Sequence, residues 1–322
     1  MEGVTRQRIL ELKGRLNMNI VEKGKEEDPV VVLIHGFPET SYSWRHQMSG
    51  IAQRGYHVVA PDLRGFGETD VPEGVHNYTI MHVVGDLVSL IDALDKEKVF
   101  VVGHDWGAVM AWGLALFRPE KVKALVNLSV PYNQRHPFFK PIAALKAAYG
   151  KNYYIVKYQE VEVAENEFAR VGSRIIVRNL ITGPNPDPPI LREEYPFGGN
   201  PLEKEHSLPP WITEQDIDHY ATKFEKTGFT GGLNYYRCLD INWELMAPWQ
   251  EDKIRVPTKF IIGDEDLVYN MPGNKDYIHN GEFKRLVPLL QDVIIMKGVG
   301  HFINQEKPEE ITNHICQFIA NF

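Results

Sequence analysis

The stretch Val99-Phe100-Val101-Val102-Gly103-His104-Asp105-Trp106-Gly107-Ala108 decides the fold of this chain. Its apolar, largely β-branched start is typical of a buried strand, and this run ends at Gly103. A second glycine, Gly107, follows four residues later, and the apolar segment 108–117 then predicts a helix. Small residues on both sides of Asp105 indicate a strained and tightly packed turn. We therefore expect a sharp strand–turn–helix corner with an aspartate at its tip.

An aspartate at the tip of this corner limits the chemistry. Its side chain is ionised at neutral pH, because its reference pKa is about 3.9, so it needs no base to become a nucleophile. Attack on a carbonyl carbon would give a reactive mixed anhydride, whereas attack on an sp³ carbon with a leaving group gives a stable alkyl ester. Asp105 therefore predicts an alkyl substrate, and the ester must then be hydrolysed by a water molecule that a base activates.

The composition is that of an ordinary globular protein: 322 residues, 43% of them hydrophobic and 24% charged. The net charge of −8 disfavours a nucleic acid partner, and no apolar run approaches the roughly 20 residues of a membrane span. The charged N-terminal segment lacks the apolar core of a signal peptide, and the C-terminus is not a peroxisomal tripeptide. With only two cysteines, Cys238 and Cys316, a disulfide framework is not expected, and a reduced, cytoplasmic setting fits better. We further expect no cofactor and no metal, and either a monomer or a weak homodimer.

Strands and helices alternate at both ends of the chain, which predicts the α/β class with a doubly wound, mostly parallel sheet. Strands are expected as a pair within 8–22 and then at 30–34, 57–60, 99–102, 124–129, 258–262 and 293–296. Helices are expected at 80–94, 108–117 and 309–321.

The alternation stops after Pro131. Residues 132–247 show no clear buried strand, and helix-like segments lie near 138–149, 161–181 and 213–226. We therefore expect an inserted helical cap at 132–247, between a first part of the α/β core at 1–131 and a second part at 248–322.

Candidate catalytic residues fall at the ends of predicted strands, where ligands bind in such sheets. The corner resembles the nucleophile elbow of α/β-hydrolases, and Asp105, Asp266 and His301 follow the chain order of their triad. The Gly-x-x-Asp spacing after 258–262 favours Asp266 over Asp264 as the acid. Asp266 is expected to fix the tautomer of His301, which would take a proton from the attacking water.

Hydrolysis of the ester also needs backbone donors for the developing oxyanion. The N–H of Trp106 is well placed, one residue after the nucleophile. The N–H of Phe37, in the turn His35-Gly36-Phe37-Pro38 after an earlier strand, is the predicted second donor.

Several motifs together resemble the plant-type soluble epoxide hydrolases, and the resemblance covers nearly the whole chain. They are His35-Gly36-Phe37-Pro38-Glu39, Ser43-Trp44-Arg45-His46-Gln47-Met48, Pro61-Asp62-Leu63-Arg64-Gly65-Phe66-Gly67, His104-Asp105-Trp106-Gly107, Asn234-Tyr235-Tyr236-Arg237 and Gly300-His301-Phe302. The resemblance implies cofactor-free hydrolysis of an aryl or fatty-acid epoxide by water, giving a vicinal diol through an aspartyl ester. It also suggests that Glu39 and His104 help to position the hydrolytic water.

The same resemblance implies two cap tyrosines that hold the epoxide oxygen. One lies in Asn234-Tyr235-Tyr236-Arg237 and points to Tyr236, with Tyr235 as the alternative and as a pocket residue. The other is Tyr154, with Tyr153 as the alternative. A phenol with a pKa of about 10 stays neutral at pH 7 and can donate a hydrogen bond or a proton to a developing alkoxide.

Two other functions fit the same fold. A haloalkane dehalogenase shares the aspartate, the histidine and the Asp-Trp-Gly sequence, but a halide is a weak base that gains little from a pair of phenols. Halide release from a bromoalkane would favour this alternative. A ligand receptor on the same fold would bind a small molecule tightly with slow or no turnover, and it has no need for a complete catalytic set. A serine esterase is disfavoured because no serine occupies the corner.

Overall fold

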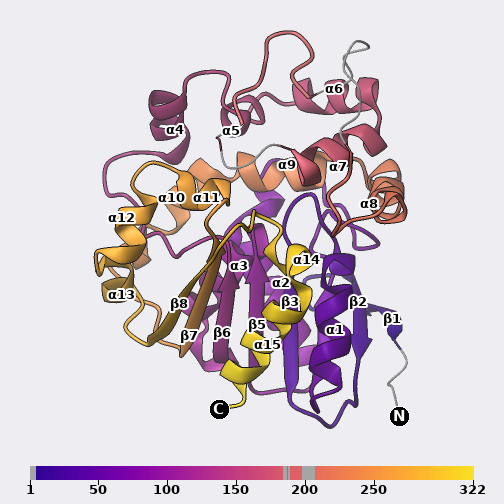
Figure 1. Cartoon of the computed structure of the whole chain (residues 1–322), viewed down its shortest axis with the longest axis vertical. Helices are drawn as coiled ribbons and strands as arrows, with labels where there is room; N and C mark the ends of the chain where they lie inside the picture. Colours follow the sequence, from indigo (N-terminus) through magenta and orange to yellow (C-terminus); the bar gives the residue numbers. More distant parts are fainter. Residues whose placement is uncertain (1–4, 184–186, 188, 198–206) are drawn as a thin grey trace.

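The structure is a computed structural model that describes residues 5–183, 187, 189–197 and 207–322. An eight-stranded sheet crosses the described part of the chain in the order β1-β2-β4-β3-β5-β6-β7-β8 (Figure 1). The strands are β1 Arg6–Glu11, β2 Asn17–Lys23, β3 Val30–Ile34, β4 His57–Pro61, β5 Val99–His104, β6 Val122–Leu128, β7 Thr258–Gly263 and β8 Leu290–Met296. β2 pairs antiparallel with β1 and β4, and the pairs from β4 to β8 are parallel. The predicted fold class is confirmed.

The central strands are buried on both faces, which explains their continuous apolar sequences. In β3, Val31 and Leu33 belong to the hydrophobic cluster under α1 Arg45–Ala52 and α15 Pro308–Ile319. Val30 and Val32 point to the opposite face, where α2 and α3 pack. The strand period of two thus divides one apolar run between two layers of helices.

The helices outside the segment between β6 and β7 cover these two faces or connect the last strands (Figure 1). They are α1 Arg45–Ala52, α2 Ile80–Ala93, α3 Trp106–Phe117, α11 Leu267–Asn270, α12 Asn274–His279, α13 Glu282–Leu286, α14 Ile303–Glu306 and α15 Pro308–Ile319. Single 3₁₀ turns lie at η1 Ser41–Trp44, η2 Val75–Tyr78, η3 Pro119–Lys121 and η4 Ala247–Trp249. In the described residues, no helix is both long enough and apolar enough to cross a membrane.

The helices between β6 and β7 lie together over one end of the sheet (Figure 1). They are α4 Pro141–Tyr149, α5 Tyr154–Lys157, α6 Val163–Val171, α7 Ser173–Thr182, α8 Glu214–Thr227, α9 Thr230–Arg237 and α10 Leu239–Leu245. The prediction of one helix over 161–181 is wrong, because Gly172 adopts φ 94 and separates α6 from α7. The predicted domain boundaries 1–131, 132–247 and 248–322 stay a prediction.

The corner between β5 and α3 is tightly packed around Asp105. This residue has φ 52 and ψ −123, a conformation that non-glycine residues rarely adopt. A Cβ atom on Gly107 would overlap the backbone carbonyl groups of Ile34 and His35. A Cβ atom on Gly103 would meet the backbone of the first turn of α3. Gly107 therefore lets α3 approach the end of β3, and Gly103 lets it approach the end of β5, so that the strained aspartate is held between them.

Substituting the second glycine tests this packing. Gly107→Ala is expected to lower the free energy of unfolding by about 1–3 kcal/mol or more, because the added methyl group meets backbone that cannot turn aside. Gly85→Ala is the matched control, since Gly85 is exposed inside α2 with open space around it. It should raise the free energy of unfolding by up to about 1 kcal/mol. Urea denaturation followed by circular dichroism measures both values, and a Gly107→Ala protein as stable as wild type would contradict the close approach.

Candidate active site

Three strand ends bring the predicted triad together. Asp105 follows β5, Asp266 follows β7 as the N-cap of α11, and His301 lies in the loop after β8. The Nδ1 atom of His301 is 3.0 Å from Oδ1 of Asp266, and its Nε2 atom is 3.4 Å from Oδ2 of Asp105. Asp264 lies elsewhere: its carboxylate accepts from the N–H of Gly298.

The predicted oxyanion donors surround Asp105. The N–H of Phe37 donates to Oδ1 of Asp105 at 2.8 Å. The N–H of Trp106 is at the first position of α3, where a backbone donor has no acceptor within its own helix. The helix N-terminus also favours a negative charge at this point. One carboxylate oxygen of Asp105 therefore already occupies the place where an ester carbonyl oxygen would need stabilisation.

Charge pairing outweighs burial at the triad. Burial alone favours neutral forms, yet Asp266 and Asp105 together raise the pKa of His301 well above its usual value. For Asp105, burial is opposed by the hydrogen bond and charge of His301, by His104 and by the N–H of Phe37, which together lower the pKa of the carboxyl group. In the free protein, His301 is therefore an imidazolium between two carboxylates.

Glu39 and His104 form a second buried pair behind the triad. The Nδ1 atom of His104 is 2.9 Å from Oε2 of Glu39, and its Nε2 atom is 2.8 Å from the backbone oxygen of His301. Both ring nitrogens face acceptors, so both carry protons. Burial opposes these charges, but each partner outweighs it, lowering the pKa of Glu39 and raising that of His104. Neither side chain lines the cavity described below, and both are fully buried.

Residues that the sequence analysis did not single out complete this network. Gln305 donates from Nε2 to Oε1 of Glu39 at 2.9 Å and accepts at Oε1 from Nη1 of Arg45 at 2.8 Å. Ser129, directly after β6, contacts both Asp266 and His301. Arg45 occurs in a motif that carried the resemblance, whereas no spacing rule marks Gln305 or Ser129.

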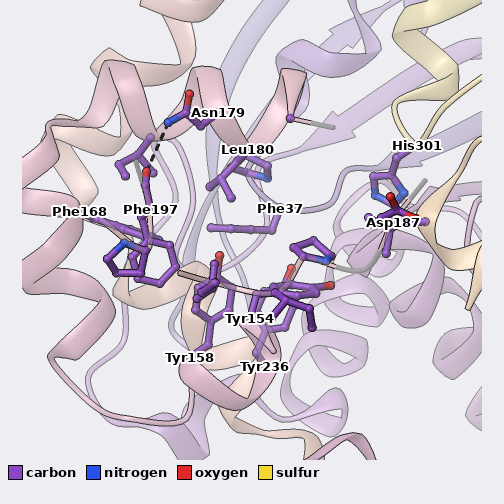
Figure 2. A pocket seen from close by; sticks show the side chains of 18 of the residues that line it. Phe37, Tyr154, Tyr158, Phe168, Asn179, Leu180, Asp187, Phe197, Tyr236 and His301 are labelled. Atoms are coloured by element: carbon purple, nitrogen blue, oxygen red, sulfur yellow. Dashed lines mark hydrogen bonds between the residues drawn. The ribbon is translucent and has the colours of Figure 1, made fainter. Parts of the chain in front are cut away.

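The triad opens into a cavity of about 520 Å³. Its lining is largely apolar and aromatic and comes from the core loops and from the helices over the sheet (Figure 2). Among the lining residues are Phe37, Asp105, Tyr154, Tyr158, Phe168, Leu180, Phe197, Tyr236, Val268 and His301. The cavity therefore suits an apolar molecule with one reactive polar group near Asp105.

The structure separates the tyrosine alternatives. Tyr154 on α5 and Tyr236 on α9 both line the cavity, with ring centroids 5.9 Å apart (Figure 2). Tyr235 does not line the cavity, contrary to its suggested pocket position, because its hydroxyl donates to the carbonyl oxygen of Arg64 at 3.1 Å. Tyr153 is buried against Tyr149 and is also absent from the lining.

Both cavity phenols stay protonated. Burial is the largest cause for both, and the pKa of Tyr154 and of Tyr236 lies well above 10. Neighbouring tyrosines and then the negative charge of Asp105 follow for Tyr154, whereas Asp105 and then Tyr158 follow for Tyr236. Both phenols can therefore donate hydrogen bonds at neutral pH. Across the residues that the structure describes, no group of three or more His, Cys, Asp or Glu side chains could hold a metal ion.

Comparison with known proteins first gives the class. A family model described as alpha/beta hydrolase fold matches residues 29–155. This agrees with the sheet order and with the position of Asp105 at the β5–α3 corner.

Relatives along the full length then give the family. Epoxide hydrolase 1 of Siraitia grosvenorii is 50% identical over 307 residues, which cover 95% of this chain and 96% of that one. Epoxide hydrolase A of Mycobacterium tuberculosis is 36% identical over 99% of this chain and 98% of that one. The crystal structure of a Vigna radiata epoxide hydrolase superposes with a TM-score of 0.95 at 49% identity, covering 99% of this chain and 98% of that one. The structure of potato (Solanum tuberosum) epoxide hydrolase I superposes with a TM-score of 0.93 at 47% identity, covering 99% of this chain and 100% of that one.

The chain belongs to the epoxide hydrolase family of the α/β-hydrolase fold and is a hydrolase. The resemblance stated from the sequence motifs is thereby confirmed.

The buried Glu39–His104 pair predicts a pH dependence of stability. The pKa of His104 is higher in the folded protein than its unfolded value of about 6.5. Its charge therefore stabilises the fold fully below pH 6.5, and this contribution is lost as the pH rises through the folded-state pKa. The difference in free energy of unfolding between wild type and His104→Gln should shrink as the pH rises from 6 to 9 in urea titrations.

His35 provides a control of opposite sign. Its Nε2 atom accepts from the N–H of Leu63 while Nδ1 contacts the carbonyl oxygen of Gly36, so the ring is neutral, and burial lowers its pKa. The difference in free energy of unfolding between wild type and His35→Gln should grow as the pH rises from 5 to 7, because His35 takes up a proton more readily in the unfolded protein. A His104 difference that follows the His35 direction would contradict the imidazolium assignment.

Proposed function

We propose that this protein hydrolyses epoxides to vicinal diols in two covalent steps, with no cofactor. The carrying observation is that the Asp105 carboxylate and the hydroxyl-bearing rings of Tyr154 and Tyr236 line one apolar cavity. A nucleophile on the core and proton donors on the helices above it can hold an epoxide between them. In this proposal residues 132–247 act as the cap, and the substrate is an aryl or fatty-acid epoxide.

In the first step, Oδ2 of Asp105 attacks a ring carbon of the epoxide. Oδ1 is held by the N–H of Phe37, whereas Oδ2 lies on the side of His301. The carbon–oxygen bond of the ring breaks as the ester bond forms. The released oxygen takes hydrogen bonds from Tyr154 and Tyr236 and a proton from one of them, which lowers the barrier for a poor leaving group.

Once Asp105 is a neutral ester, the imidazolium of His301 gives up its Nε2 proton, and this proton restores the phenol that lost one in the first step. In the second step, Nε2 of the neutral His301 removes a proton from water, and the resulting hydroxide attacks the ester carbonyl carbon. The oxyanion forms on Oδ1, beside the N–H groups of Phe37 and Trp106. Collapse of the tetrahedral intermediate breaks the ester bond, and the departing diol oxygen receives the proton from His301. The carboxyl proton left on Asp105 then passes to His301, which restores the carboxylate and the imidazolium. Asp266 stabilises the imidazolium in between. His104, which is paired with Glu39, donates a hydrogen bond from Nε2 to the backbone oxygen of His301. This bond holds the loop that carries His301 and so helps to position the attacking water.

The two phenols also distinguish this reaction from dehalogenation. The pKa of each phenol lies well above 10. Such a weak acid can stabilise a strongly basic alkoxide by donating a hydrogen bond or a proton, whereas a weakly basic halide ion gains little stabilisation from it. Release of chloride or bromide from haloalkanes should therefore not be detected.

Trapping the ester tests the covalent mechanism. His301→Gln should still be alkylated by a simple aryl epoxide and then stall, because no base remains to activate water. Intact-protein mass spectrometry should show an added mass equal to that of the epoxide. Asp105→Ala is the control and should show neither adduct nor turnover. Rapid diol formation by His301→Gln without an adduct would refute the covalent route.

Two neighbouring tyrosines on one helix give a matched test of the phenol role. Tyr236→Phe should slow alkylation roughly ten- to thousandfold, the scale of losing one oxyanion donor. Tyr235→Phe should leave the alkylation rate within about threefold of wild type and cost stability of about 1 kcal/mol, because it loses only the bond to the Arg64 carbonyl. Rapid-quench measurements of adduct formation give both rates, and the opposite ranking would transfer the role to Tyr235.

A further inference from the structure

Ser129 lies at the centre of a contact that the triad alone does not explain. It follows β6 directly and is fully buried. Its hydroxyl donates to Oδ2 of Asp266 at 2.6 Å, and its oxygen is 3.0 Å from Nδ1 of His301. The chain thus places a third side chain between the acid and the base, from a strand that supplies no triad member.

The single hydroxyl proton decides how these contacts work. An ionised carboxylate only accepts hydrogen bonds, so the proton of Ser129 is directed to Asp266. The serine oxygen then has only lone pairs for His301, and Nδ1 faces two acceptors, Oγ of Ser129 and Oδ1 of Asp266, each at 3.0 Å. Nδ1 therefore keeps its proton even when the ring is neutral. The free lone pair of neutral His301 is on Nε2, which faces Asp105.

The same hydroxyl also fixes the acid. Oδ1 of Asp266 accepts from Val268 N–H at 2.8 Å and from His301, while Oδ2 accepts from Ser129. Leaving a buried carboxylate oxygen without its hydrogen-bond donor costs free energy, and the carboxylate group can rotate to find another donor. The serine hydroxyl thus holds the carboxylate plane in the orientation that His301 needs.

We infer that Ser129 is a positioning residue for ester hydrolysis, which holds Asp266 in place and keeps Nε2 of neutral His301 free to deprotonate water. The inference rests on the proposed function, because that proposal makes His301 the base of the second step. Attack by Asp105 on the epoxide needs no base, so the first step does not depend on this hydroxyl.

The backbone of Ser129 offers a way to separate its hydroxyl from its conformation. Its φ is 72, a left-handed value that favours glycine. Ser129→Ala removes the hydroxyl and keeps the strained Cβ, whereas Ser129→Gly removes the hydroxyl and relieves the strain. An effect common to both variants belongs to the hydroxyl.

The experiment measures the two half-reactions separately with an aryl epoxide, using rapid quench and intact-protein mass spectrometry. For Ser129→Ala and Ser129→Gly we expect ester hydrolysis to slow roughly ten- to hundredfold, the effect of leaving a buried charged acceptor without its donor. The alkylation rate and kcat/KM should stay within about threefold of wild type, while kcat and KM fall together. Ser43→Ala is the control: its buried hydroxyl has no partner within the described residues, and both rates should match wild type.

Each outcome has a distinct meaning. Wild-type ester hydrolysis in both Ser129 variants overturns the inference, and so does slow hydrolysis in Ser129→Ala alone, because Ser129→Gly lacks the hydroxyl as well. Equal slowing of both half-reactions also overturns it, because it indicates a general structural role. If Ser129→Ala folds poorly, Ser129→Gly carries the test. A failure of His301→Gln to trap any ester would instead refute the proposed function, whatever the Ser129 variants do.

Discussion

The arrangement of this site depends on three carboxylates that are almost fully shielded from solvent. Glu39 and Asp266 are fully buried, and the side chain of Asp105 is 15% exposed. An isolated ionised carboxylate in such a place is costly, and it persists only when it is paired and hydrogen bonded. The chain supplies two imidazoles, so that His104 neutralises Glu39 and His301 lies between the other two carboxylates. Negative and positive groups alternate through the site, and each depends on its neighbour for its charge.

This alternation has a consequence for a two-step reaction. While Asp105 is an anion, it helps to hold the proton on His301. In the proposed mechanism, conversion of Asp105 to a neutral ester removes that charge, and the pKa of His301 then falls, which allows it to act as a base. In that mechanism His301 is inactive as a base while Asp105 is free and becomes available once the ester needs hydrolysis. The positive charge of the nearby His104 imidazolium also lowers the affinity of His301 for its proton.

The meeting of Asp105, Asp266 and His301 could be predicted because backbone geometry gives each a local signature. Glycines that allow a close approach mark Asp105, and strand ends mark Asp266 and His301. Ser129 has no such signature. It is 137 residues from Asp266, and the two meet because β6 is the neighbour of β7 in the sheet, a relation that no short motif encodes.

Gln305 escaped sequence analysis for the same reason, since its partners Glu39 and Arg45 lie more than 250 residues away along the chain. The break in the predicted helix 161–181 was visible in principle at Gly172, but a glycine inside a periodic pattern does not always end a helix. Long-range partners of polar side chains therefore required the structure.

The choice between two adjacent tyrosines shows what finally sets the site geometry. Neighbouring residues on a helix point about 100° apart, so rotation of α9 decides which phenol enters the cavity. Close packing fixes that rotation, because Gly231 lies against the backbone of Gly65, and Gly232 lies against the ring of Phe37. The N–H of Phe37 in turn donates a hydrogen bond to Asp105, and the Phe37 ring packs against that of Tyr236 with the two ring centroids 5.8 Å apart. One residue of the core thus holds the carboxylate of Asp105 and packs against the helix that carries Tyr236, so the backbone and the ring of Phe37 together fix how these two side chains lie relative to each other.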